Sequence, residues 1–414
     1  MKLIHTSDWH LGHHLYEKNR EQEHNRFLNW MIEELKTQKA DVLIVAGDIF
    51  DTGFPPNYSL KQYYNFLRRL ADTTCSNVII IGGNHDSPST LNAPREVLKF
   101  LNIYVVGGSE NDLSDEVILV KDKSEEPLAI VCAVPYLRLR DTNKALIGET
   151  YEQKEEAYSQ GIKKHYYDVA LKAREIMEKT GLKLPVIATG HLFAAGSSIR
   201  VSESERDLYI GGHVKVGETS FHPDFNYVAL GHMHEAQLVN KNEHMRFSGS
   251  PIPLSFGEAG RDKVMIKVEF NNSELESLSQ ITIPCFRKLL RFTGKLNDVI
   301  TKIKSIDEKS CPIMQPWAEI LLDEDKIIPA DLNQINELAK IKNFEILKLK
   351  LNKKEKFLLE TKEVFDLNEL TPLEVFIKKC ELTELTDEQK EILIRTYNEL
   401  FLENNNFIKV NSEI

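Results

Sequence analysis

Two histidines one residue apart follow an apolar run in the stretch ALGHMHEAQ, residues 229–237. In extended chain, residues i and i+2 point to the same side, so His232 and His234 can reach toward one point in space. The neighbouring Gly231 lets the backbone turn without a Cβ penalty. A pair of imidazoles at this spacing favours metal ligation, and other segments must then supply the remaining ligands.

Four further polar clusters each follow an apolar, strand-like run. They are Asp8 and His10 in SDWH, Asp48 and Asp51 in AGDIFD, Asn84, His85 and Asp86 in GGNHD, and His191 in TGHL. A solvated loop aspartate or a capping asparagine would explain any one cluster alone. Together, a carboxylate able to bridge, several imidazoles and no thiolate indicate a pair of divalent ions such as manganese or iron rather than a structural zinc. Two such ions about 3.5–4 Å apart can clamp a phosphate and lower the pKa of a bridging water.

The elements that must position these clusters alternate between strands and helices. KLIHTS, DVLIVAG, NVIIIGG and IYVVGG are predicted strands, and residues 21–38 place Phe27, Met31 and Leu35 at helical spacing between the first two. This alternation predicts a largely parallel sheet, whose functional residues gather at the carboxyl ends of the strands. EVILVKD, PLAIVCAVPY, LPVIATGHL, NYVALGHMH, HMRFSGSPIPLSF and KVMIKVEF are further predicted strands, with a charged helical insertion over about residues 141–179.

Composition describes an ordinary globular protein. The chain has 414 residues, 42% hydrophobic and 28% charged, which predicts roughly two to three domains. The net charge of −11 does not indicate a nucleic-acid binder, so such a role would need local basic patches, metal ions or a partner. The absence of a long apolar run predicts a cytoplasmic protein without a membrane segment. Five widely spaced cysteines without a C-x-x-C pair are expected to be reduced thiols: Cys75, Cys132, Cys285, Cys311 and Cys380.

Composition shifts after about Ile281, which predicts three parts: residues 1–281, 282–365 and 366–414. WAEILLDE, PADLNQINELAK and FEILKLKL predict a strand–helix–strand unit in the second part. The third part is predicted to be helical, because Thr386 and Gln389 fit a capping box, with Leu393 and Tyr397 at helical spacing beyond it. This helical tail could pack on its own domain or dock a partner.

The five clusters match, in order, the pattern D-x-H, G-D-x-x-D, G-N-H-[DE], G-H and G-H-x-H. Over roughly the first 260 residues the chain therefore resembles the calcineurin-like metallophosphoesterase superfamily. The resemblance implies an α/β fold with two stacked mixed β-sheets flanked by helices, followed here by a small α+β cap domain and the C-terminal helical tail. It also implies two sets of metal ligands: Asp8, His10 and His234 for one ion, Asn84, His191 and His232 for the other, with Asp48 bridging them.

By the same resemblance, His85 would protonate the leaving oxygen or stabilise charge in the transition state. Asp51 matches the position that orients this histidine, which makes it a supporting residue. Asp86 is expected to be a structural hydrogen-bond acceptor. The other histidines are interpreted as structural: His5, His13, His14, His24, His165, His213, His222 and His244.

Further segments resemble the SbcD family of nuclease subunits: TSDWHLG, AGDIFDTG, GNHDSPSTLN, SESERDLYIGG, YVALGHMH and SGSPIPLSF. The resemblance implies a Mn²⁺-dependent double-strand DNA exonuclease with single-strand or hairpin endonuclease activity, acting in repair, recombination and replication. It also implies a homodimer and an SbcC ATPase partner. The chain lacks G-x-x-x-x-G-K-[ST], which fits an ATPase on another polypeptide. The tail would dock this partner through Phe376, Ile377, Leu393, Tyr397 and Phe401.

Two other functions stay open at this point. The catalytic pattern is shared with metallophosphoesterases that act on cyclic nucleotides or nucleotides, whereas a non-catalytic scaffold is disfavoured because every inferred ligand is present. A nuclease with this negative charge needs a few basic residues near the strand being cut. The candidates, which could equally be ordinary solvated charges, are Lys61, Arg68, Arg69, Arg138 and Arg140.

Overall fold

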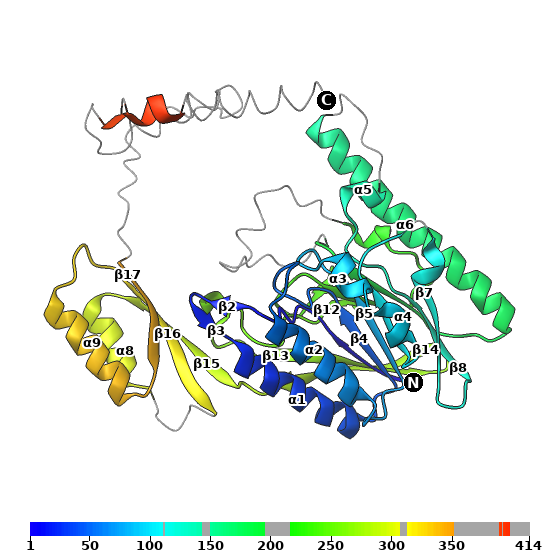
Figure 1. Cartoon of the computed structure of the whole chain (residues 1–414), viewed down its shortest axis with the longest axis horizontal. Coiled ribbons are helices and arrows are strands. Elements are labelled where there is room, and N and C mark those ends of the chain that lie inside the picture. Colours follow the sequence, from blue (N-terminus) through cyan, green and yellow to red (C-terminus); the bar gives the residue numbers. More distant parts are fainter. Residues whose placement is uncertain are drawn as a thin grey trace. The chain divides into compact units, whose positions relative to one another are not determined.

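Two six-stranded mixed sheets form the body of the protein in the computed structural model (Figure 1). In the first sheet, ordered β14-β13-β1-β4-β5-β6, strands β1, β4, β5 and β6 pair in parallel, and β13 pairs antiparallel with both β1 and β14. Its strands are β1 (Lys2–Thr6), β4 (Val42–Ala46), β5 (Asn77–Ile81), β6 (Ile103–Val106), β13 (Lys263–Asn271) and β14 (Glu274–Ile283). The alternation of strands and helices therefore predicted the parallel half of this sheet correctly.

The second sheet is ordered β11-β12-β10-β9-β8-β7, with β8, β9, β10 and β12 parallel and the two edge strands antiparallel. Its strands are β7 (Val117–Lys121), β8 (Pro127–Cys132), β9 (Val186–His191), β10 (Tyr227–Gly231), β11 (Gln237–Val239) and β12 (Asn242–Phe247). The two stacked mixed sheets expected from the sequence are confirmed.

Helices cover the outer face of each sheet, which gives four layers (Figure 1). Strand β4 shows why: Leu43 packs among helix residues on one side, while Ile44 packs in the apolar layer between the sheets. Helix α1 (Glu21–Gln38) buries Phe27, Met31 and Leu35 against the first sheet. The other helices of this body are α2 (Asn57–Leu70), α3 (Pro88–Asn92), α4 (Arg95–Lys99), α5 (Leu139–Thr142) and α6 (Tyr151–Thr180), with short 3₁₀ turns η1 (Leu113–Asp115), η3 (Glu218–Ser220) and η4 (Phe256–Glu258).

One predicted strand is only partly a strand. In HMRFSGSPIPLSF, β12 ends at Phe247, and the following residues are irregular up to η4. Pro251 and Pro253 have no amide hydrogen, so they cannot donate to a sheet ladder. We call residues 248–258 the proline segment.

A third, smaller sheet follows β14. Its strands are all parallel, in the order β15-β16-β17, with a helix in each connection. The elements are β15 (Arg287–Gly294), α8 (Leu296–Lys304), β16 (Met314–Leu322), α9 (Pro329–Ile341) and β17 (Glu345–Leu351). The predicted strand–helix–strand unit is thus preceded by a further strand and helix, and the pattern is two consecutive crossovers rather than segregated helices and strands.

This small domain contacts the main body next to the strand-end clusters. Leu15, in the hairpin of β2 (His14–Leu15) and β3 (Lys18–Asn19), packs with Phe256, Leu289 and Trp317 in one buried cluster. Glu23 of α1 accepts a hydrogen bond from Arg287 at 2.9 Å. The β2–β3 hairpin, which follows His10, and η4, which follows His234, therefore both contact the small domain.

The structure describes residues 1–110, 112–142, 150–194, 216–306, 313–351, 389–390 and 392–397. Residues 1–353 form one unit and residues 354–414 a second. Within the tail, residues 389–390 and 392–397 are helical, and Leu393 is 39% exposed. Thr386, Phe376, Ile377 and Phe401 lie outside the described residues, as do Cys311, Cys380, His213 and the segment SESERDLYIGG. Among the helices described, none combines the length and the apolar character needed to cross a bilayer.

Candidate metal centre

The polar clusters meet at the carboxyl ends of β1, β4, β5, β9 and β10. Within the part of the chain that the structure describes, two groups of three buried residues present ligand atoms within 4.8 Å of one another: Asp8, His10 and His234, and Asp48, His191 and His232. We call them the first and second groups. Each group has the carboxylate and imidazole donors that divalent manganese, iron or zinc ions accept.

Tight turns at the strand ends aim these side chains over the edge of the sheets. Asp8, His10, Asp48 and His232 all have positive φ, at 52°, 46°, 49° and 101°. Such values are uncommon for residues other than glycine and cluster at functional sites. The extended-chain reason for pairing His232 with His234 was therefore wrong, because β10 ends at Gly231 and the two imidazoles belong to different groups.

In the second group, main-chain contacts decide which nitrogen faces inward. His191 Nδ1 donates to the carbonyl oxygen of Ala46 at 2.9 Å, so its Nε2 is turned toward Asp48 Oδ2, 3.2 Å away. The side-chain oxygen of Asn84 lies 3.0 Å from the same Nε2 and 3.1 Å from His232 Nδ1. Asn84 thus joins this group as a fourth donor.

The first group is oriented by carboxylates. His10 Nδ1 donates to Asp51 Oδ1 at 3.1 Å, and its Nε2 lies 3.5 Å from Asp48 Oδ2 and has no hydrogen-bond partner among the described residues. Asp8 Oδ1 accepts the main-chain amide of His232 at 2.9 Å, which ties the two groups together. One oxygen of Asp48 therefore faces a histidine of each group. A buried imidazole nitrogen without a partner fits a metal ligand.

Burial and close charges shift the pKa values of these groups in opposite directions. Burial alone would lower the pKa of His10 and His191, but the neighbouring carboxylates, Asp48 above all for His191 and Asp51 for His10, raise both to about 9. Burial would raise the pKa of Asp48, yet the charges of His191 and His10 hold it well below its usual range. Burial raises the pKa of Asp8 to about 6. Without metal, the centre therefore balances its carboxylates with protons on two histidines.

His85 differs from these buried residues because it is half-buried at the rim of the centre. Its ring lies 4.9 Å from that of His10, and its main-chain amide donates to Asp48 Oδ1 at 3.0 Å. Its Nδ1 donates to the main-chain carbonyl oxygen of Asp51 at 2.8 Å, which leaves Nε2 for other contacts. Asp51 thus contacts His85 through its carbonyl group, while its carboxylate contacts His10 and His13.

Asp86 and two glycines let the strand ends approach closely. Asp86 is buried and accepts the main-chain amides of Ile49, Phe50 and Gly83 at 2.9–3.0 Å, as expected for a structural acceptor. A Cβ atom on Gly83 would lie 2.1 Å from Asp48 Oδ1, and one on Gly231 would lie 1.9 Å from the carbonyl oxygen of Ala46. A larger residue at position 83 would displace Asp48, and one at position 231 would displace the Ala46 carbonyl group that holds His191.

Three supporting residues were not predicted. His13, interpreted as structural, places one ring nitrogen 3.0 Å from Asp51 Oδ1 and the other 3.0 Å from the carbonyl oxygen of Leu254. Buried Lys263 donates to the carbonyl oxygen of His234 at 2.9 Å and to Glu258 Oε2 at 2.5 Å. These contacts tie the first group to the proline segment. No local pattern in the sequence marks them, since the partners are far apart along the chain.

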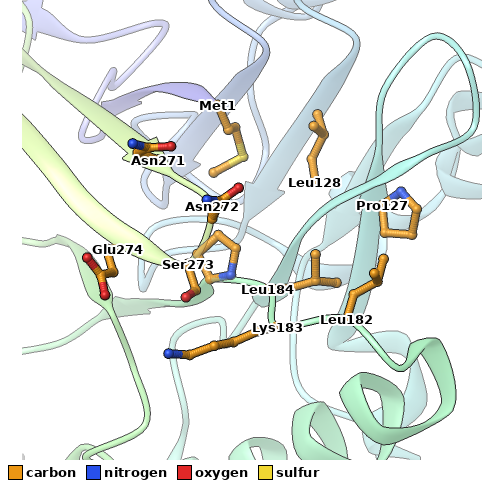
Figure 2. Close-up of a pocket in the computed structure, with 11 residues that line it drawn as sticks. Met1, Pro127, Leu128, Leu182, Lys183, Leu184, Asn271, Asn272, Ser273 and Glu274 are labelled. Carbon is orange, nitrogen blue, oxygen red and sulfur yellow. The ribbon is translucent and has the colours of Figure 1, made fainter.

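A surface pocket lies at the other end of the strands. Its volume is about 720 Å³, and its lining includes Met1 before β1, Pro127 at the start of β8 and Asn272 in the β13–β14 turn (Figure 2). None of the predicted site residues lines this pocket. The chemistry predicted from the sequence belongs to the carboxyl ends of the strands, as in other α/β folds.

Known proteins share both the main body and the small domain. Residues 1–236 match the calcineurin-like phosphoesterase family, and residues 285–384 match the family described as type 5 capsule protein repressor C-terminal domain. The chain is 35% identical to the D subunit of the nuclease SbcCD of Escherichia coli K12, over 95% of this chain and 96% of that protein. It is 30% identical to the corresponding protein of Bacillus subtilis, over 70% and 72% of the two chains, and 34% identical to that of Rhodobacter capsulatus, over 63% and 64%.

Proposed function

Because the chain belongs to the calcineurin-like phosphoesterase family and, within it, to the SbcD nuclease subunits, we propose that it is a two-metal-ion DNA nuclease that works with an SbcC ATPase. It cleaves phosphodiesters as a double-strand exonuclease and as a single-strand or hairpin endonuclease, in the cytoplasm, during DNA repair, recombination and replication. The observation that carries this proposal is the pair of buried Asp/His groups that face one carboxylate, Asp48, with half-buried His85 at their rim.

The donor set fits two divalent ions, and both ions are proposed to be Mn²⁺. Asp8, His10 and His234 would hold one ion, Asn84, His191 and His232 would hold the other, and Asp48 would bridge them. When bound, such a pair polarises the phosphoryl oxygen and supplies a water of lowered pKa. The contacts of His191 with Ala46 and of His10 with Asp51 keep the ligating nitrogens oriented.

His85 is the proposed acid. Its Nδ1 is held by the carbonyl oxygen of Asp51, so Nε2 can carry a proton to the leaving oxygen or donate a hydrogen bond to the charge that develops on the phosphate. Asp51 is the proposed positioning residue for both histidines: its carbonyl group holds His85, and its carboxylate holds His10. No protein nucleophile is required.

We test the function by incubating end-labelled linear duplex and hairpin DNA with the purified chain, Mn²⁺, SbcC and ATP. We expect degradation of both substrates, and complete loss of cleavage when EDTA removes the metal. Hydrolysis of cyclic nucleotides or nucleotides by a protein that leaves DNA intact, even with SbcC and ATP, would contradict the nuclease proposal.

Residues 366–414 are the proposed SbcC-docking segment, so a chain cut after Asp366 should no longer co-purify with SbcC.

Metal binding should release protons, because the ligating imidazoles must be neutral. With pKa values of about 9, His10 and His191 are protonated in the metal-free protein at pH 7.5, so loading both groups should release about two protons. Apparent affinity should rise as the pH rises toward 9, and release should fall toward zero above that pH. Titration calorimetry in buffers of different ionisation enthalpy measures the release; equal heats in all buffers at pH 7.5 would contradict this prediction.

The proposed assembly includes a homodimer of this chain, formed at the end of α4. Val97, Phe100 and Leu101 are 69%, 91% and 61% exposed, and their spacing places them on one face. Three exposed apolar side chains that share one face favour an interface. We expect Phe100→Asp to shift the chain from dimer to monomer in light scattering, whereas Leu171→Asp, at a 50% exposed position on α6, should leave the mass unchanged. A monomeric wild type would contradict the proposal.

A further inference from the structure

Arg138 lies at the same edge of the sheets as the candidate metal centre. It belongs to the segment between β8 and α5, which is fixed there because the main-chain amide of Tyr136 donates to the carbonyl oxygen of Gly82 at 2.9 Å. Arg138 Nη2 donates to the carbonyl oxygen of Asp86 at 3.3 Å. The guanidinium group therefore lies beside the residue that directly follows His85.

The charge of Arg138 is not neutralised by a neighbour. Among the residues that the structure describes, no carboxylate lies within ion-pair distance of its guanidinium group, although acidic residues are close by. The carboxylate of Asp141 accepts the main-chain amide of Arg138 at 2.8 Å and pairs with Arg140 at 3.6 Å. The carboxylate of Asp86 is occupied by three main-chain amides. In a chain with net charge −11, a half-buried cation without a carboxylate partner favours an external anion.

An aromatic side chain fixes the direction of the guanidinium group. Arg138 lies over the ring of Tyr136 at 5.9 Å, and this ring meets the ring of His191 edge-on at 6.4 Å. Tyr136 thus stands between the second group and Arg138. Most donors of the guanidinium group remain available for the paired oxygens of a phosphate, because its one hydrogen bond to a described residue uses Nη2.

We propose that Arg138 binds a backbone phosphate of the DNA strand next to the phosphate that is cut. This inference rests on the proposed nuclease function and adds a binding residue to it. The two metal groups receive the scissile phosphate, and the guanidinium beside Asp86 receives its neighbour, so the strand is held in register over His85. Contacts of this kind position a nucleic acid without reading its sequence. Tyr136 is a positioning residue that holds the guanidinium group in place.

Arg140 offers a matched control two residues away. It lies in α5, its side chain is 77% exposed, and it pairs with Asp141. The experiment compares Arg138→Gln and Arg140→Gln in the full chain with SbcC, Mn²⁺ and ATP. The substrates are a linear DNA duplex and bis(p-nitrophenyl) phosphate, a small phosphodiester with no neighbouring phosphate.

For Arg138→Gln, we expect the ratio of DNA cleavage to small-diester hydrolysis, each as kcat/KM, to fall about tenfold to a hundredfold, the range for a lost charge-assisted hydrogen bond. The loss should reside mainly in KM, and the slope of log(kcat/KM) against log[salt] should decrease by about 1. For Arg140→Gln, the ratio should stay within about twofold of wild type.

Three results would overturn the proposal. An unchanged ratio in Arg138→Gln would exclude a phosphate contact. An equal loss on both substrates would mean that Arg138 only supports the segment that carries His85. An equal fall of the ratio in Arg140→Gln would indicate diffuse attraction rather than a specific site. A wild type that hydrolyses the small diester but no DNA would contradict the nuclease function itself, which distinguishes that failure from the failure of this inference.

Discussion

Replacing His85 with alanine should lower Mn²⁺-dependent DNA cleavage by about 10²- to 10⁴-fold, the usual contribution of a positioned acid or base. His85 is half-buried at the rim of the centre, and its Nδ1 is engaged by the carbonyl oxygen of Asp51. The effect should appear in kcat, because the interaction with the leaving oxygen develops only in the transition state. Single-turnover cleavage of end-labelled duplex DNA measures the rate.

The metal content separates this role from metal ligation. We expect His85→Ala to bind two ions per chain, as wild type does, because His85 belongs to neither group of converging donors. His244→Ala provides the control, since His244 is an exposed histidine on β12 whose Nδ1 contacts the carbonyl oxygen of Asn226. Wild-type cleavage by His85→Ala would remove His85 from the mechanism, and loss of an ion would instead make it a ligand.

The second large effect concerns the contact between the small domain and the main body. Replacing Glu23 with glutamine should lower the free energy of unfolding by about 3–5 kcal/mol, the cost of removing one partner of a buried charge cluster. Glu23 is 1% exposed, contacts buried Arg20 through both carboxylate oxygens, and accepts a hydrogen bond from Arg287 at 2.9 Å. The guanidinium group of Arg287 in turn lies 3.9 Å from the centre of the Trp317 ring. Among the residues that the structure describes, the substitution leaves two guanidinium groups without a carboxylate partner.

Urea unfolding of EDTA-treated protein measures this effect without a contribution from metal binding. Glu33→Gln is the matched control on the same helix, because Glu33 pairs with Lys36 at 3.0 Å and the two side chains are 66% and 40% exposed. An exposed pair of this kind should contribute about 0.5 kcal/mol or less. If both variants unfold at the same urea concentration, the cluster at Glu23 does not stabilise the fold.

The proline segment connects these two regions. The carbonyl oxygen of Pro253 accepts a hydrogen bond from Arg20, and the next carbonyl, that of Leu254, contacts His13. His13 contacts Asp51, whose carboxylate orients His10. A continuous set of hydrogen bonds therefore runs from the charge cluster that holds the small domain to the first metal group.

Local patterns in the sequence were sufficient for the elements and for the residues that converge. Each cluster follows its own apolar run, so the rule that functional residues gather at the carboxyl ends of parallel strands could be applied to each separately. Apolar residues at period-two spacing located most strands, and apolar residues at helical spacing located helix α1. Both patterns depend only on residues close together in the sequence. The strand expected in the proline segment failed because Pro251 and Pro253 have no amide hydrogen to donate to a sheet ladder.

The sequence by itself determined the family, the donor types and hence the class of chemistry, since these depend on residue identity and on short spacings. Only the tertiary structure decided which oxygen of Asp48 faces a histidine of each group, and that Asp51 holds His85 by its carbonyl group. It also decided the contact of Glu23 with Arg287, 264 positions apart. The reason is physical: burial, positive φ and long-range hydrogen bonds arise from packing between distant segments, and a local pattern contains no information about those partners.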